Sequence, residues 1–202
     1  MAGFYFIWQI LFYFGRFHKM RLRLNHIGYI ANKIALELYN ASFVTLNVPL
    51  ESLSKVAQEI LESDTKKELA IDKKAQEIVE ENQQEVDFIR ADERRLFGLI
   101  KRQIANEEKF LLFWDDRYNA LSHKILDALI QKQYISFHIS NNQVKNVIFK
   151  AIDSFAKMHD SIQDEVMQKI KNYKRKLLAG TDEYELIYEK LYDEELRKKG
   201  FL

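Results

Sequence analysis

The chain has 202 residues, of which 47% are hydrophobic and 30% charged, a balance that excludes a disordered polymer. It contains no cysteine, which removes disulfides, thiolate metal sites and thiol nucleophiles, and we expect a reducing, cytoplasmic location. The formal net charge of +1 gives no overall field that would attract a polyanion, so nucleic-acid binding would need a local basic patch.

The chain begins with an aromatic and apolar stretch over residues 4–14, followed by Gly15 and Arg16. A transmembrane helix needs roughly 20 apolar residues, and a secretory signal carries its charges before the apolar stretch rather than after it. Three interpretations remain: a membrane-surface anchor, a staple packed on the body, or translated sequence upstream of a true start at Met20. We favour the last because the stretch fits no targeting pattern, and we expect membrane contact only if residues 4–14 provide it.

The second half of the chain repeats the pattern of the first half at a constant shift of 91 residues. At this shift the segment Phe-Val-Thr-Leu-Asn-Val at 43–48 aligns, class for class, with Tyr-Ile-Ser-Phe-His-Ile at 134–139. We therefore predict an internal duplication, because a fixed period marks repeated structural units.

The duplication divides the chain into three parts. Residues 1–19 form the apolar N-terminal extension, residues 20–111 the first helical repeat unit and residues 112–202 the second. The predicted fold is mostly α, with two tandem and similar units that each contain a helix, a short β-like segment and then three helices.

In the first unit, apolar residues at three- and four-residue spacing predict three of the four helices. The stripes are Ile27, Ile30, Ile34 and Leu38; then Leu53, Val56 and Ile60; and finally Leu96, Phe97, Ile100 and Ile104. Pro49 is placed to open the second helix, and Thr65 with Glu68 forms a capping box that predicts the start of a third. Asp92 and Glu93 open the fourth.

The second unit shows the same order. Its stripes are Tyr118, Leu121, Ile125 and Leu129; then Val144, Val147, Ile148 and Ala151; then Ile162, Val166, Ile170, Tyr173 and Leu177; and finally Tyr184, Ile187, Tyr188 and Leu191. Ser140 with Gln143 forms a capping box, and Gly180 followed by Thr181 marks a helix end and the next helix start.

The junction between the two units, residues 110–114, is apolar and lacks the composition of a flexible linker, so we expect the units to pack on each other there. Two isolated β-like hexapeptides cannot form a stable sheet alone. We hypothesise that residues 43–48 and 134–139 pair with each other across a local twofold axis.

No pattern typical of an enzyme or a metal site is present. The chain has no Glu-x-x-His pair, no Gly-x-Ser-x-Gly elbow and no glycine-rich phosphate loop. The histidines are scattered and are interpreted as hydrogen-bonded polar side chains: His18, His26, His123, His138 and His159. We expect no catalytic residue, no metal, no cofactor and no small-molecule substrate.

The segment from Val166 to Thr181 concentrates positive charge, because it contains five lysine or arginine residues and no acidic residue. Its candidate phosphate- or partner-binding residues are Lys169, Lys171, Tyr173, Lys174, Arg175 and Lys176. Lysine and arginine beside an aromatic side chain suit a nucleic-acid backbone. The simpler interpretation, which we favour, is that these cations complement the dipole at the C-terminus of a helix.

Two stretches carry a family resemblance. The first is Met20-Arg21-Leu22-Arg23-Leu24 with His26, and the second is the tail with Tyr173-Lys174-Arg175-Lys176, Gly180-Thr181-Asp182-Glu183-Tyr184-Glu185 and Leu191-Tyr192-Asp193-Glu194-Glu195-Leu196-Arg197-Lys198-Lys199-Gly200. With them the chain resembles, over residues 20–202, the bacterial domain-of-unknown-function family 507. The resemblance implies a cytoplasmic, largely helical and elongated protein, and it supplies no activity.

The sequence therefore does not determine a function. We expect a non-catalytic helical module that acts through macromolecular contacts, with a protein partner or by self-association. The alternative is a nucleic-acid-binding protein that uses the basic segment at 169–176, helped by Arg197, Lys198 and Lys199.

Overall fold

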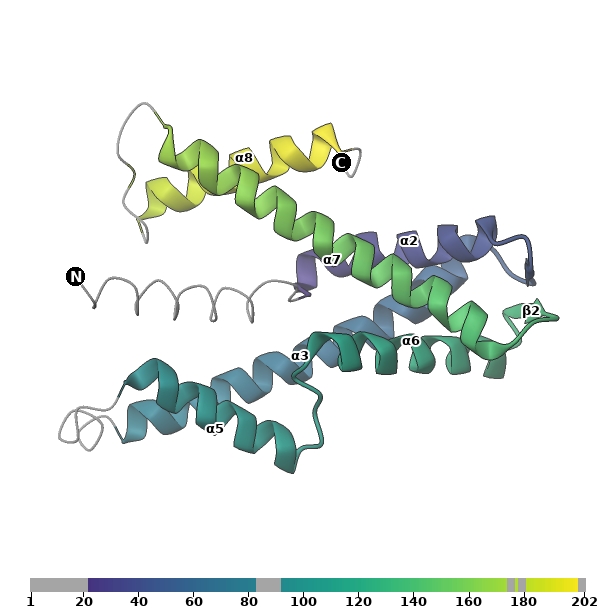
Figure 1. The fold of residues 1–202 in the computed structure, drawn as a ribbon, viewed down its shortest axis with the longest axis horizontal. Helices are drawn as coiled ribbons and strands as arrows, with labels where there is room; N and C mark the ends of the chain where they lie inside the picture. Colours follow the sequence, from purple (N-terminus) through teal and green to yellow (C-terminus); the bar gives the residue numbers. More distant parts are fainter. Residues whose placement is uncertain (1–21, 83–91, 174–176, 178–180, 200–202) are drawn as a thin grey trace, which may run out of the picture. The chain divides into compact units, whose positions relative to one another are not determined.

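The computed structural model describes residues 22–82, 92–173, 177 and 181–199 (Figure 1). The fold in these residues is mostly α-helical, as predicted. The elements in chain order are η1 (Leu24–His26), α2 (Ile27–Asn40), β1 (Val44–Leu46), α3 (Leu50–Glu81), α5 (Glu93–Glu107), α6 (Trp114–Gln131), β2 (Ile135–Phe137), α7 (Asn141–Lys171) and α8 (Asp182–Lys198).

The predicted pairing of the two β-like segments is confirmed. Strands β1 and β2 form an antiparallel ribbon in which Thr45 pairs with Ser136. These two residues are also equivalent at the shift of 91, so a local twofold axis passes through the middle of the ribbon. The strands are shorter than the predicted hexapeptides, with three residues each.

The bounds of the larger elements follow the same shift. Helices α2 and α6 end at Asn40 and Gln131, and helices α3 and α7 begin at Leu50 and Asn141. Each half therefore has the order helix, strand, long helix, helix in the residues described. The duplication itself stays a prediction.

The prediction of three helices after each strand is wrong for the described residues. Helix α3 runs unbroken from Leu50 to Glu81, through the Thr65–Glu68 pair that was expected to start a new helix. Helix α7 is likewise continuous from Asn141 to Lys171. Neither segment contains glycine or proline after its start, so nothing in the backbone interrupts the i to i−4 hydrogen bonds.

The chain divides into two compact units at Ile152, within α7, rather than at the predicted boundary between residues 111 and 112. The larger unit spans Leu22–Ile152, and the described residues from Asp153 onward belong to the other. The reason lies in contacts that cross the predicted boundary, namely the β1–β2 ribbon and the packing of α3 against α6.

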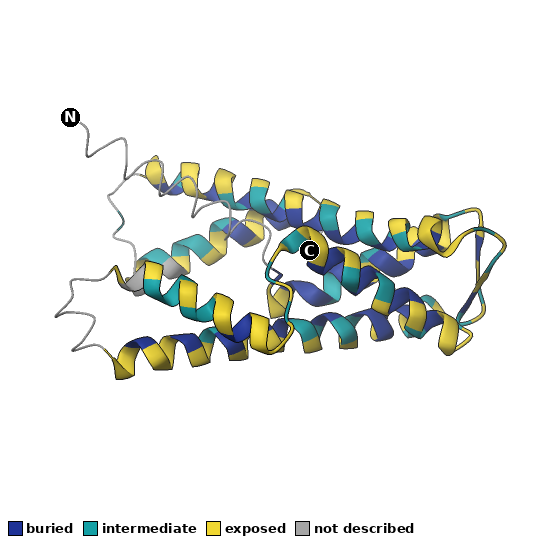
Figure 2. Ribbon diagram, turned by 60° about the horizontal axis from the view of Figure 1, so that its bottom comes forward, coloured by how far each residue is buried: buried dark blue, intermediate teal, exposed yellow. Residues whose placement is uncertain are grey.

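The core of the larger unit is built by the predicted apolar stripes, which form the dark inner faces in Figure 2. Helix α2 packs on α3, and α3 also packs on α5 and α6. The buried residues of α2 are Ile27, Ile30, Ala31, Ile34, Ala35 and Leu38, and those of α6 include Tyr118, Leu121, Ile125, Leu126 and Leu129.

The second half of α3 and helix α5 form a helical hairpin with a small core of its own. Ile71 and Ala75 of α3 are buried against Ile104 and Ala105 of α5. Partly buried side chains complete the cluster: Phe97, Ile100, Phe110 and Leu112. Through Phe110 and Leu112, its first and third residues, the apolar junction at 110–114 packs on this hairpin. The packing of two repeat units on each other at the junction stays a prediction.

The other unit is also held by a two-helix core. Buried Ile162, Val166 and Ile170 of α7 pack with Tyr192 and Leu196 of α8. Along α8 the rings of Tyr184, Tyr188 and Tyr192 stack in sequence, with centroids 6.4 and 6.1 Å apart, and the ring of His159 lies 5.4 Å from that of Tyr192. No helix in the described part of the chain carries an apolar stretch of the length needed to cross a membrane.

Gln133, in the turn between α6 and β2, offers a test of this local geometry. Its φ of 59° lies in the left-handed region, which costs a non-glycine residue about 1–2 kcal/mol. Its backbone oxygen accepts a 2.9 Å hydrogen bond from the side chain of Asn47, so the conformation is tied to the β1 side of the ribbon. We expect Gln133→Gly to raise the free energy of unfolding by about 0.5–1 kcal/mol in urea denaturation. Gln131→Gly, in the last turn of α6, should lower it; a loss of stability in both variants would contradict the assignment.

Candidate functional site

The predicted basic segment starts in the last turn of α7. Lys169, Lys171 and Tyr173 lie within the described residues, whereas Lys174, Arg175 and Lys176 lie outside them. Lys171 is exposed, and the side chain of Tyr173 is 41% exposed. The described part of the segment thus presents one cation and one aromatic ring to solvent.

Lys169 serves the packing of α8 on α7. Its ammonium group pairs with the carboxylate of Glu195 on α8, which also accepts a 2.7 Å hydrogen bond from Lys198. Lys199 pairs with Glu165 of α7 at 3.0 Å. Lys169, Lys198 and Lys199, which the sequence suggested for nucleic-acid contacts, are therefore engaged by carboxylates within their own unit.

Glu195 is the centre of this ion-pair group. The residue is only 4% exposed, and the hydrogen bonds from Lys169 and Lys198 lower its pKa from 4.5 to about 2. A carboxyl group whose pKa is depressed by folding stabilises the native state above its unfolded pKa. That stabilisation is lost as the pH falls through the folded value.

The pH dependence of Glu195→Gln tests this role. We expect the parent to lose stability as the pH is lowered from about 4.5 to about 2, and the variant to show a flatter curve in that window. At pH 7 the variant should be less stable by about 1.5 kcal/mol, the value for a hydrogen bond to a charged group. Chemical denaturation at several pH values measures both effects. Glu194→Gln, at the exposed neighbouring position, is the control, and identical curves for the two variants would refute the assignment.

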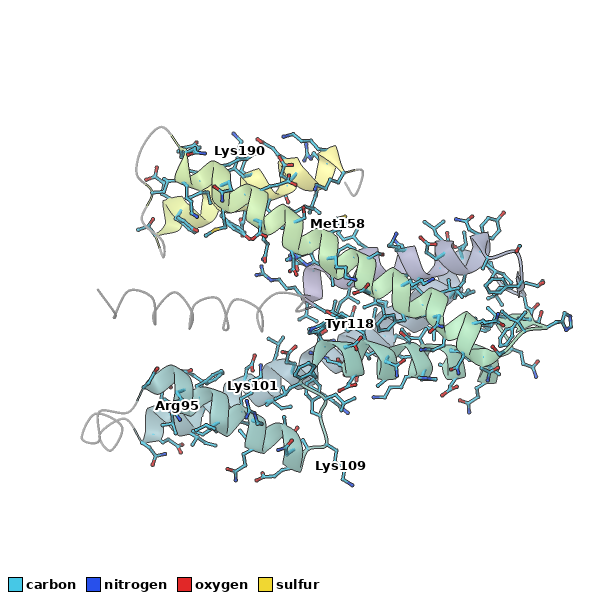
Figure 3. The ribbon with its side chains drawn as sticks, in the orientation of Figure 1. Arg95, Lys101, Lys109, Tyr118, Met158 and Lys190 are labelled. Atoms are coloured by element: carbon cyan, nitrogen blue, oxygen red, sulfur yellow. The ribbon has the colours of Figure 1, made fainter. Side chains whose placement is uncertain are left out.

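A second charged group, which the sequence analysis missed, is buried between α3 and α6. The guanidinium of Arg117 on α6 donates to Asp64 at 2.6 Å and to Glu68 at 2.7 Å, and Arg117 is only 5% exposed. Lys101, labelled on α5 in Figure 3, pairs with Glu68 at 3.4 Å and with Asp72 at 2.6 Å. The group therefore joins three helices of the larger unit.

An aromatic ring and two carboxylates together fix the position of the Arg117 guanidinium. Its guanidinium carbon lies 4.7 Å from the ring centroid of Phe110, which covers the charge with an aromatic face. Burial opposes the charged form, but the carboxylates of Glu68 and Asp64 outweigh that penalty and raise the pKa of Arg117. Such a pair contributes strongly only while both partners are present.

The equivalent position in the first half differs in chemistry. His26 lies 91 residues before Arg117 and is also buried. Burial, with a smaller contribution from Arg23, lowers the pKa of His26 from 6.5 to about 4, so the imidazole is neutral at pH 7. One half of the chain thus places a buried charge where the other places a neutral ring.

The spacing of the acidic residues in this group could have predicted a buried ion pair. Asp64, Glu68 and Asp72 follow one another at four-residue spacing on the face of α3 that also carries buried Leu61 and Ile71. Carboxylates on a buried helical face need a cationic partner. Because Glu68 was assigned to a capping box with Thr65, no cationic partner for its carboxylate was predicted.

Arg117→Ala tests the buried group. Removing Arg117 takes away the cation that Asp64 and Glu68 share and leaves Glu68 with Lys101 alone, so we expect a loss of about 3–5 kcal/mol in the free energy of unfolding. Lys73→Ala removes an exposed ion pair with Glu77 on the same helix and should cost less than about 0.5 kcal/mol. Equal losses in guanidinium denaturation would contradict the importance of burial.

The described surface also has solvent-open hollows lined mostly by polar and charged side chains, and two of them lie on α7 and on α2 and α3. One lies along α7 and includes Lys157, Asp164 and Gln168. The other lies between α2 and α3 and includes Asn32, Ser54 and Glu59. Among the described residues no three histidine or carboxylate side chains are grouped so that they could hold a metal ion.

The fold and these sites define a mostly helical protein in which two helix–strand–helix segments share one antiparallel ribbon (Figure 1). The family model described as "Protein of unknown function (DUF507)" matches residues 20–201, so the chain belongs to this family. The expectation from the sequence, membership over residues 20–202, is confirmed. A comparison with curated proteins found no match. The family description names no activity, so it assigns no role to any residue here.

Proposed function

We propose that this protein is a non-catalytic helical module that acts through contacts with other proteins in the bacterial cytoplasm. The observation that carries the proposal is the outer face of α2. Leu36 is 50% exposed and Tyr39 is 62% exposed. On the inner face of the same helix, six apolar residues are already buried.

These two exposed side chains are not needed to hold α2 in place. They lie three residues apart, so they are neighbours on one side of the helix. A single exposed apolar side chain is common, whereas adjacent large ones favour a contact surface. Tyrosine in particular offers a large apolar area with few rotatable bonds, which suits protein interfaces.

The alternative is nucleic-acid binding through the basic segment. Its support is that Lys171 is exposed, with no ion pair to another described residue, and lies two residues from the exposed ring of Tyr173. Lys174, Arg175 and Lys176 extend the positive charge in the sequence. The engagement of Lys169 by Glu195 reduces the charge that this surface can offer, so we place this alternative second.

Site-specific photo-cross-linking in the native bacterium tests the proposal. A photoreactive phenylalanine analogue replaces Leu36 or Tyr39, and in a matched control it replaces Asn106, an exposed polar residue of α5. We expect discrete protein adducts at positions 36 and 39, none at position 106, and no change after nuclease treatment.

Two outcomes would contradict the proposal. Adducts of equal yield at positions 36, 39 and 106, or at none of them, would mean that the outer face of α2 has no specific partner. Adducts that disappear after nuclease treatment, and that do not form in the variant Lys171→Ala/Tyr173→Ala, would instead support nucleic-acid binding.

A further inference from the structure

The hollow between α2 and α3 is lined by Asn32 of α2 and by residues of α3 that include the small Ser54. The hydroxyl of Ser54 donates a 2.6 Å hydrogen bond to the side-chain oxygen of Asn32. Gly28 lies one turn before Asn32 on α2, and a Cβ atom added there would meet no other atom within 4 Å. A longer side chain at Ser54, which lines the hollow, would enter it, and one at Gly28 would extend from α2 one turn before Asn32.

At the equivalent positions in the second half, two longer side chains bridge α6 and the start of α7. Asn119 stands at the position of Gly28, and Lys145 at the position of Ser54. The ammonium group of Lys145 donates to the side-chain oxygen of Asn119 at 2.7 Å. It also lies 5.7 Å from the ring centroid of Phe149. We call this bridged copy the closed surface and the α2–α3 hollow the open one, because Gly28 has no side chain that could form such a bridge with Ser54.

The two surfaces also differ in charge. Glu51 and Glu59 line the open hollow, where Lys55 is the cation between them. Neither carboxylate has an ion pair with another described residue. Glu62, at the end of the hollow, pairs with Lys66 at 3.3 Å. At the shift of 91, Glu51 and Glu59 are replaced by Asn142 and Lys150, so the closed copy lacks both carboxylates.

The open hollow adjoins the apolar outer face of α2. Leu36 lies one turn after Asn32 on that helix, and Tyr39 follows within the next turn. A groove that combines exposed apolar side chains with carboxylates suits an amphipathic helix, which presents apolar anchors and cations from one face. Oppositely charged side chains across the contact would fix its orientation and speed its association.

We propose that the hollow between α2 and α3 binds a basic amphipathic helix of another protein. In this arrangement apolar side chains of the partner lie on Leu36 and Tyr39, and its cations face Glu51 and Glu59. A second copy of the chain is the less suitable occupant, because Lys145, on the basic surface it would offer, is already bonded to Asn119. The inference rests on the proposed function and specifies its site and the chemistry of its partner.

Exchange of the two pairs of residues between the halves tests the inference. The probe is a fluorescein-labelled 14-residue peptide of leucine and lysine at helical spacing, and its counterpart carries glutamate in place of lysine. Fluorescence anisotropy should show saturable binding of the lysine peptide to the full-length parent, weakened by salt. Gly28→Asn/Ser54→Lys, which copies the closed surface, should bind the lysine peptide at least tenfold more weakly.

Two further variants separate the closing of the hollow from a general loss of structure. Asn119→Gly/Lys145→Ser opens the other surface, and it should keep the parent's affinity at the α2–α3 hollow. Glu51→Gln/Glu59→Gln leaves the hollow open, and it should bind more weakly with a smaller dependence on salt. Circular dichroism melting verifies that each variant is folded before its affinity is compared.

Equal affinity of the parent and Gly28→Asn/Ser54→Lys for the lysine peptide would overturn the inference, as would equal binding of the glutamate peptide. Self-association of the parent in sedimentation velocity, abolished in Gly28→Asn/Ser54→Lys, would overturn it in favour of a second copy. If the peptide results are negative while cross-links at Leu36 and Tyr39 persist, the hollow is refuted and the proposed function stands. If neither peptide binding nor specific cross-links at Leu36 and Tyr39 are observed, both the docking site and the proposed function are refuted.

Discussion

The antiparallel pairing of β1 with β2 is the contact on which the larger unit depends. It joins residues 91 positions apart, and it places Thr45 and Ser136 on a local twofold axis. The ribbon bonds are extended by the backbone amide of Asn47, which donates to Tyr134 at 2.9 Å. Strands of three residues have little stability alone, and β1 contacts α2 while β2 contacts α6. The ribbon and the packing of α3 against α6 therefore join residues on both sides of residue 111 within one compact unit.

Positions related by the shift of 91 differ in chemistry. Arg117 is a buried cation that fixes α6 to α3, whereas His26 at the equivalent position is neutral. Gly28 has no side chain to reach α3, whereas Asn119 accepts a hydrogen bond from Lys145 of α7. In such a pair of surfaces, one copy can keep a structural role while the other is free to bind a partner. This asymmetry is the physical basis of the proposed docking site.

The helices and the ribbon could be predicted from the sequence because they depend on local periodicity. The stripe from Ile27 to Leu38 and the stripe from Tyr118 to Leu129 are buried as expected. The continuity of α3 could not be predicted in the same way, since Thr65 and Glu68 match a capping box. The true partner of Glu68 is Arg117, which lies 49 residues away in the sequence. Only tertiary packing reveals such a pair.

The site residues show the same limit. Cations at the end of α7 are visible in the sequence, but the engagement of Lys169 by Glu195 depends on how α8 packs, 26 residues later. The residues of the open hollow were also visible at the shift of 91. The bond between Lys145 and Asn119, in contrast, depends on how α6 and α7 pack and cannot be read from the sequence. Local patterns identified the elements, and contacts between elements assigned the roles.

The most direct test of the central claim is native-state hydrogen exchange, followed by mass spectrometry, across the larger unit at increasing denaturant. If the ribbon joins the halves into one unit, the most protected amides of α2 and of α6 must merge into a single opening reaction with one denaturant dependence. Separate openings on the two sides of residue 111, with different free energies and slopes, would show that the halves fold independently and would contradict this structure-based division of the chain.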